Sequence, residues 1–470
     1  MPRSNSSAPA PVDYSRYSFW LETSGESLAP RPPLAGHVSA DVAILGAGFT
    51  GLWTAYYLLR RQPSLRVAIL ERHIAGFGAS GRNGGWCSSG FAVTPAVLQE
   101  RFGRERARAT ILALYDTVDE VGRVVARETI EACYAKSGSL RLARGPYQQP
   151  LLQQSYAAYE TLGVADHYRV LSAQETAERL RVSDAVGSLY NSDCAVVHPG
   201  RLVRGLARTV ERRGATIYEQ TDVVDVEAGR SRRLITTHGA VRAETIVLAG
   251  EAYLTRLRTM RRRLVPIYSS IVLTEPLTPE QWAQIGWAGR ECVASFRLSV
   301  DYLSRTPDGR ILFGGRGAPY HFGSRIEDGY DLHGPTHGAL REMVRTWFPS
   351  LRGVRFTHAW GGPLGVSRDW MPSVCYDRRT GVAHACGYAG QGVAAANLAG
   401  RLLADLIAGV PSSLLDLPVV GHRPRPWEPE PLRWLGVRFV QNGYRRIDDR
   451  GRRTGRAPSG TSLTERLGRH

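Results

Sequence analysis

Lysine is almost missing from this 470-residue chain: Lys136 stands alone against 59 arginines. The formal net charge is +17, a value that suits a polyanionic partner. The arginines, however, are scattered in pairs and triplets such as 261–263 and do not line one face of a helix. The excess of arginine over lysine is typical of a GC-rich coding sequence. The scattered placement of the arginines argues against a nucleic-acid partner.

Cysteine and long apolar runs are also scarce. The six cysteines include no CxxC pair, which excludes a cysteine zinc site of usual spacing and fits a reducing cytoplasm. His333 and His337 stand in a Gly/Pro-containing segment that favours surface or capping roles, so no metal is predicted. The N-terminus lacks the apolar core of a signal peptide, and no apolar stretch is long enough to span a bilayer. We therefore expect a cytoplasmic protein without stable membrane insertion.

Glycine, by contrast, occurs at regular, motif-like spacing in residues 41–51. An apolar run, 42–45, predicts a buried parallel strand, and Gly46, Gly48 and Gly51 follow it with the GxGxxG spacing. These glycines allow a tight turn, a close approach to a pyrophosphate and close packing of the next helix, 52–60. The next strand, 67–70, ends on Glu71, where an acidic side chain can bind ribose hydroxyls. The unit predicts a dinucleotide site.

Two further glycine loops indicate that the dinucleotide is a flavin. Residues 76–85 are dense in glycine, which a nicotinamide enzyme does not require. Residues 387–392 form a second loop that opens an apolar helix, 393–407, closed by Gly409. The N-terminus of that helix can stabilise the negative charge of a reduced flavin. Alone, this loop fits an ordinary βα connection equally well, but paired with residues 41–71 it favours FAD.

These motifs resemble the D-amino-acid oxidase superfamily of FAD proteins, and most closely its γ-glutamylputrescine oxidase-like branch. The resemblance covers roughly residues 40–410 in the family's order. It implies an α/β fold in which an FAD-binding Rossmann-like domain of the glutathione-reductase type carries an inserted, discontinuous α+β substrate domain built on an antiparallel sheet. The segments that carry the resemblance are 41–71, 78–85, 198–202, 219–223, 244–250, 308–315 and 360–392.

The resemblance also implies which residues hold FAD. Val223 would contact the adenine through its backbone, Gly250 would mark a strand end near the pyrophosphate, and residues 387–392 would cap the pyrimidine ring. The predicted cofactor-binding residues are Gly46, Gly48, Phe49, Thr50, Gly51, Glu71, Arg72, Gly78, Ser80, Arg82, Asn83, Gly84, Val223, Gly250, Gly362, Gly387, Tyr388, Gly390, Gln391, Gly392 and Val393.

The chain departs from the family in three places. Residues 360–369 lack the cysteine, and residues 76–85 lack the histidine, that attach flavin covalently in some members, so non-covalent FAD is expected. The position of the lysine that binds the substrate carboxylate in sarcosine oxidases matches Ala394. The oxygen-activating lysine has no counterpart, which leaves O2 and another electron carrier open as acceptors.

The chemistry implied is oxidation of a C–H bond next to nitrogen in a small-molecule amine or amino-acid-like substrate, with hydride passing to flavin N5. Two alternatives remain: a flavin-dependent RNA-modifying oxidase, and an FAD-binding protein without turnover. Each predicted catalytic residue also has a packing or phosphate-binding alternative. These residues are Tyr268, Tyr302, Arg316, His358 and Trp360.

The chain is expected to pass between domains several times. The predicted parts are a tail (1–38) anchored by residues 19–21, FAD-binding segments (39–92, 198–262 and 356–412), a helical substrate segment (93–197), a substrate sheet (263–355) and a basic extension (413–470). Within the extension, residues 427–447 predict an arginine-rich amphipathic helix. We expect this helix to pack on the parent domain rather than lie on a membrane, and the residues from about Arg450 to be disordered.

Overall fold

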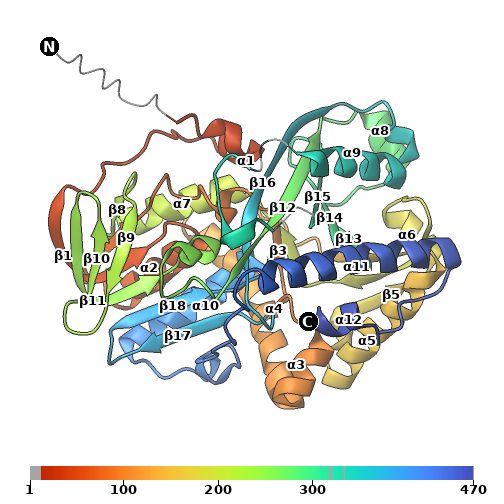
Figure 1. The fold of residues 1–470 in the computed structure, drawn as a ribbon. Coiled ribbons are helices and arrows are strands. Elements are labelled where there is room, and N and C mark those ends of the chain that lie inside the picture. The colour runs from red at the N-terminus through yellow and green to blue at the C-terminus, as the bar shows by residue number, and fades with distance from the viewer. Residues whose placement is uncertain (1–11, 317–319, 331, 333, 469–470) are drawn as a thin grey trace, which may run out of the picture.

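The computed structural model describes residues 12–316, 320–330, 332 and 334–468, with only the backbone of Arg316. Two eight-stranded sheets form the framework, and the chain passes back and forth between them. The first sheet lies on the left of Figure 1, and the second lies on the right. The predicted α/β fold class is confirmed.

The first sheet is built around β1 (Gly36–Leu45), which pairs in parallel with β2 (Val67–Leu70) and β11 (Gly239–Leu248). Its main strand order is β17-β18-β11-β1-β2-β8, and a β9-β10 hairpin extends from β11. Because parallel strands end at the same edge, Gly46, Glu71 and Ala249 follow three neighbouring strands side by side. The remaining strands are β8 (Thr216–Tyr218), β9 (Val223–Glu227), β10 (Arg233–Thr236), β17 (Ser373–Asp377) and β18 (Val382–Cys386).

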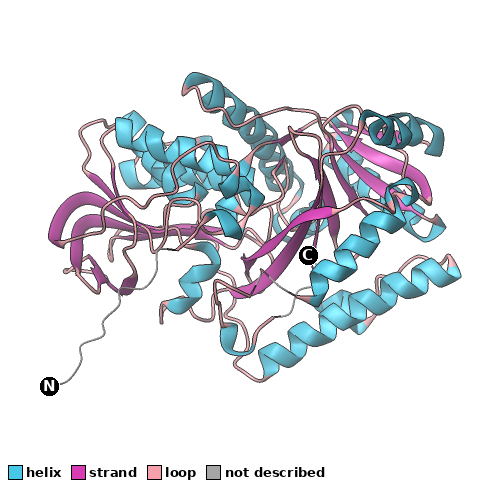
Figure 2. Ribbon diagram, turned by 90° about the horizontal axis from the view of Figure 1, so that it is seen from above, coloured by secondary structure: helices cyan, strands magenta, loops and turns pink. Residues whose placement is uncertain are grey.

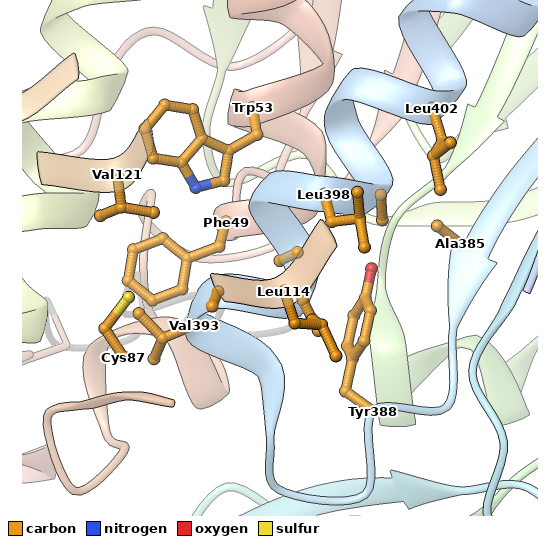
Figure 3. Packing of buried hydrophobic residues seen from close by; sticks show 14 of the residues in the cluster. Phe49, Trp53, Cys87, Leu114, Val121, Ala385, Tyr388, Val393, Leu398 and Leu402 are labelled. Carbon is orange, nitrogen blue, oxygen red and sulfur yellow. The ribbon is translucent and has the colours of Figure 1, made fainter. Parts of the chain in front are cut away.

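Helices α2 (Phe49–Arg61) and α10 (Gly392–Ala408) pack tightly on one another beside this sheet. A Cβ added at Gly400 would lie 2.6 Å from the Cβ of Trp53, so the two backbones are close. Figure 3 shows Phe49 and Trp53 beside Val393 and Leu398 in this core. The predicted helices at 52–60 and 393–407 are confirmed, and α7 (Pro199–Arg212) also packs on α2.

The second sheet has the order β16-β12-β15-β14-β13-β4-β6-β5. Its neighbours are antiparallel, as predicted, except that β13 and β4 run parallel. One face packs under α9 (Pro335–Trp347) through a cluster that includes Leu303, Phe313 and Trp347. The strands are β4 (Ser139–Arg144), β5 (Tyr168–Leu171), β6 (Ala185–Asn191), β12 (Val265–Thr274), β13 (Cys292–Ser295), β14 (Asp301–Arg305), β15 (Ile311–Arg316) and β16 (Phe356–Val366).

Further helices and a small sheet connect these parts, with the helices seen around the two sheets in Figure 2. Gly103, at φ 82°, separates α3 from α4. These elements are α3 (Pro95–Phe102), α4 (Arg104–Arg127), α5 (Gln149–Leu162), α6 (Ala173–Arg179), α8 (Pro279–Ile285) and the β3 (Trp86–Ser88)–β7 (Cys194–Val196) pair.

The N-terminal segment is held by α1 (Phe19–Glu22), whose first three residues are buried as predicted. The C-terminal extension forms α11 (Leu432–Thr454) and α12 (Leu463–Leu467). Val437 packs against Val265 and Tyr320, so α11 lies on the body of the protein, as expected. The prediction of disorder from about Arg450 is wrong, because Tyr444 donates a hydrogen bond to the Gly468 carbonyl (2.6 Å) and ties α12 to α11. Across the described residues, every helix is too short or too polar to cross a membrane.

Candidate active site

A cavity is bounded by the strand ends of the first sheet and by one face of the second sheet. The first sheet contributes the turn after β1, the end of β2 and residues 249–254, 256 and 257, which follow β11. The second sheet contributes Ser269, Ile271, Ala294 and Tyr302. The cavity therefore combines a glycine-rich wall with a wall of hydroxyl and apolar side chains.

The three glycines after β1 are required for different contacts. Gly46 has φ 104°, and its added Cβ would lie 2.9 Å from the Ala249 carbonyl oxygen. A Cβ on Gly51 would lie 2.0 Å from the Gly46 oxygen, so this glycine closes the turn against the helix. A Cβ on Gly48 would lie 2.9 Å from Ser80 Oγ, at the cavity wall. Gly48 thus keeps open the space in front of the α2 N-terminus.

Glu71 lies at the end of β2, as the sequence predicted. Its carboxylate accepts hydrogen bonds from the backbone amides of Ala47 and His73, both at 3.0 Å. Burial raises the pKa of Glu71 against the opposing effect of these two amides. The side chain therefore connects the glycine turn to the second strand and borders the cavity.

The second glycine loop, 76–85, is braced by its own side chains. Arg82 is buried, donates from Nε to the Phe77 carbonyl (2.7 Å) and lies over the Phe77 ring at 4.1 Å. Asn83 donates to the Ala79 and Ser80 carbonyls and accepts from the Gly85 amide. These bonds fix a loop whose backbone faces the cavity.

The third glycine loop precedes α10 and is held by Glu251. Its carboxylate accepts hydrogen bonds from the Gly387 amide (2.9 Å) and the Tyr388 amide (3.3 Å). The Tyr388 hydroxyl lies 2.9 Å from Thr50 Oγ1, which joins this loop to α2. Desolvation raises the pKa of Glu251 to about 7. Glu251 is not among the residues predicted from the sequence, where its only signal is an acidic residue directly after Gly250.

The structure brings the predicted cofactor residues together. All of them line the cavity except Gly51, which supports the turn from behind, and Gly387, whose amide is bound by Glu251. The residues fit FAD for two reasons. The cavity wall contains glycine positions that leave no room for a side chain, and it also contains the N-termini of α2 and α10.

The five predicted catalytic residues differ in their positions relative to the cavity. Tyr302 lines the cavity, with its hydroxyl 3.1 Å from Ser269 Oγ and its ring where a Cβ on Gly84 would lie. Tyr268 does not line the cavity, because side chains alternate along β12 and its ring packs against His321 instead. Arg316 ends β15, and its side chain lies outside the described structure.

His358 and Trp360 lie on β16 away from the cavity lining. His358 Nε2 lies 2.9 Å from Glu22 Oε2, beside α1. Trp360 is buried and donates from Nε1 to the Arg82 carbonyl at 2.9 Å, so it supports the second glycine loop from behind.

Comparisons with known proteins agree with this geometry. The DAO model, described as FAD dependent oxidoreductase, matches residues 41–406. Gamma-glutamylputrescine oxidoreductase of Escherichia coli (strain K12) is 28% identical over 83% of this chain and 89% of its own length. Probable oxidoreductase OrdL of Rhizobium meliloti (strain 1021) is 31% identical over 85% of this chain and 90% of its own length. The crystal structure of glycine oxidase from Geobacillus kaustophilus has a TM-score of 0.65 at 23% identity, covering 82% of this chain and 99% of that one.

Proposed function

The chain belongs to the FAD dependent oxidoreductase family, and on that premise we propose that it oxidises a C–N bond of an amine or amino-acid-like substrate. The observation that carries the proposal is the composite cavity, in which a glycine-rich cofactor wall faces Tyr302 and Ser269. Relatives named gamma-glutamylputrescine oxidoreductase and glycine oxidase support an amine or amino-acid substrate. Those names lend no support to an RNA-modifying oxidase or to a protein without turnover.

The cofactor wall would hold FAD through its three glycine loops. The Gly46–Gly48 turn and the α2 N-terminus would receive the pyrophosphate, Glu71 the ribose, and residues 387–392 the pyrimidine ring. When bound, FAD supplies the hydride acceptor. The chain itself would orient the amine and exclude water, and the paired hydroxyls of Tyr302 and Ser269 would hold a polar group of the substrate at that wall.

FAD is proposed to bind without a covalent bond. The described lining of the cavity contains no cysteine, and its one histidine, His73, stacks on Phe77 and lies 3.1 Å from Asp328. Acid precipitation of the purified yellow protein should release FAD into the supernatant. Flavin that stays with the precipitated polypeptide would contradict non-covalent binding.

Anaerobic titration of the FAD-loaded protein tests the reaction. A panel of primary amines, secondary amines and amino acids is added while the flavin absorbance is followed. Bleaching by at least one amine, with the imine or carbonyl product recovered, supports the proposal. Bleaching by dithionite but by no amine would contradict it and favour a protein without turnover.

A further inference from the structure

Arg141 lies next to the second-sheet wall of the cavity, outside the lining itself. It lies on β4, and its register partner on β13 is Ala294, which lines the cavity. Ala294 is in turn opposite Tyr302 on β14. Tyr302, Ala294 and Arg141 therefore form one row across three neighbouring strands.

The side chains of this row lie on the face of the sheet that borders the cavity, where Ala294 and Tyr302 line it. The adjacent row, formed by Leu303, Val293 and Leu140, packs in the cluster under α9. Because side chains alternate between the two faces of a sheet, the row with Arg141 points to the opposite face. Ala143, two residues along β4, packs in the core shared with α2 and α10, which agrees with this orientation.

Arg141 is exposed to solvent. Its Nε donates to the Ser295 carbonyl (3.4 Å), and its charge lies 4.2 Å from the centroid of the buried Phe296 ring. Among the described residues, no carboxylate forms an ion pair with it; Asp301 is occupied by the Ser295 amide and hydroxyl. Desolvation lowers the pKa of the guanidinium, while Tyr159 and Asp301 act in the opposite direction.

An arginine in this position is suited to an anion. The planar guanidinium presents paired donors that match a carboxylate, and partial desolvation strengthens that contact. Strands are spaced about 4.8 Å apart, so Arg141 lies about 10 Å along the sheet from Tyr302. A carboxylate bound there would belong to the end of the substrate remote from the wall formed by Tyr302 and Ser269.

We propose that Arg141 is a specificity-determining residue that binds a carboxylate at the far end of an extended amine substrate. The inference rests on the proposed amine oxidation and narrows its substrate class to amines that carry a carboxylate several bonds from the reacting carbon. A short amino acid would not span the row from Tyr302 to Arg141.

The test compares matched ligands and matched variants of the FAD-loaded protein. The ligands are 6-aminohexanoate, hexylamine, 4-aminobutanoate and the non-oxidisable hexanoate. The variants are Arg141→Met, Arg141→Gln, Arg141→Lys and Arg169→Met. Arg169 is a matched control because it is an exposed arginine on β5 whose register partner Tyr190 packs against the α9 cluster, on the opposite face.

Hexanoate binding, followed by the change in flavin absorbance and by calorimetry, requires no turnover. We expect Arg141→Met and Arg141→Gln to weaken it by about 10-fold to 100-fold, the size of a lost charge-assisted contact. Arg141→Lys should retain part of the affinity, and Arg169→Met all of it. In the wild type, 6-aminohexanoate should reduce the flavin more efficiently than hexylamine or 4-aminobutanoate does. Only Arg141→Met and Arg141→Gln, which lack the charge, should lose the preference for 6-aminohexanoate over hexylamine.

The two proposals fail in different ways. If no amine reduces the flavin but hexanoate binding depends on Arg141, the proposed reaction is wrong and the carboxylate site stands. If hexanoate does not bind, or binds the wild type and both uncharged variants alike, the Arg141 proposal is overturned whatever the amines do. Gln is included because it keeps polarity at the site if the Met variant fails to fold.

Discussion

Two glycines of the turn after β1 have different roles, because Gly51 is needed for the fold and Gly48 borders the space for the cofactor. An added Cβ at Gly51 meets backbone, the Gly46 oxygen at 2.0 Å, and the backbone of a packed turn cannot move away cheaply. An added Cβ at Gly48 meets only the hydroxyl of Ser80, at 2.9 Å. Gly48 is thus the position where a side chain can fill the cofactor space while the fold survives.

We predict that Gly48→Val gives a folded protein without FAD. The valine would occupy the space in front of the α2 N-terminus that the pyrophosphate needs. Flavin content is measured from the ratio of flavin to protein absorbance, and folding from far-UV circular dichroism. Gly338→Ala in α9, where an added Cβ meets nothing within 4 Å, is the control and should keep its flavin. Stoichiometric FAD in folded Gly48→Val would show that the pyrophosphate binds elsewhere.

Glu251 should make stability depend on pH. Its pKa is raised from 4.5 to about 7 by desolvation, so its contribution to stability is fully present below pH 4.5 and is lost as the pH rises to about 7. The loss is at most about 3 kcal/mol. Glu251→Gln removes the titrating group. The melting temperature of the variant relative to that of the wild type should therefore rise between pH 5 and pH 8. A difference that stays constant across this range would contradict the assignment.

At the scale of elements, the C-terminal extension holds a loop beside the cavity. Asp448 of α11 is buried and accepts hydrogen bonds from the Leu298 amide (3.1 Å), the Ser299 amide (3.0 Å) and the Ser299 hydroxyl (2.6 Å). The next residue, Val300, lines the cavity with φ 55°, a value that a β-branched residue rarely adopts. A helix outside the family match therefore fixes part of the cavity wall.

We predict that Asp448→Ala lowers the free energy of unfolding by about 2–4 kcal/mol, because two backbone amides lose a buried charged acceptor. Asp449→Ala is the control, because this neighbour is exposed and should change stability by less than about 0.5 kcal/mol. Chemical denaturation measures both. If the two variants are equally stable, α11 does not hold the loop.

Elements with local signals were predictable, whereas those made by long-range contacts were not. The Val67–Leu70 strand and the helix after the 387–392 glycine loop follow from short patterns of apolar residues and glycine, and both are confirmed. The order of α12 depends on contacts with α11 that the polar sequence does not reveal. His358 shows the same limit, since only the fold discloses that it lies away from the cavity lining and 2.9 Å from Glu22.

At the scale of the whole molecule, the distribution of positive charge bears on the electron acceptor. Lys136, the single lysine, is bound to Asp119 (2.7 Å) and Asp193 (3.0 Å) and does not line the cavity. Among the predicted catalytic residues, Arg316 and His358 are the two that can carry a positive charge. His358 is bound to Glu22 at the N-terminal segment, so Arg316 is the remaining candidate of these two. Fixed positive charge near a reduced flavin favours electron transfer to O2, because superoxide forms in that step.

We predict that O2 is a poor acceptor for the substrate-reduced protein. Stopped-flow mixing with air-saturated buffer should show slow reoxidation of the flavin, and a quinone-like dye should reoxidise it faster, as in a dehydrogenase. Lys136→Met and His358→Ala are controls that should leave the oxygen rate unchanged, since both side chains are tied to carboxylates away from the cavity lining. Rapid reoxidation by O2 would contradict the prediction. If reoxidation by O2 were rapid and stayed rapid in Arg316→Met, a fixed charge at position 316 would be excluded as the cause. If reoxidation slowed in Arg316→Met but not in the two controls, Arg316 would be identified as the group that replaces the lysine.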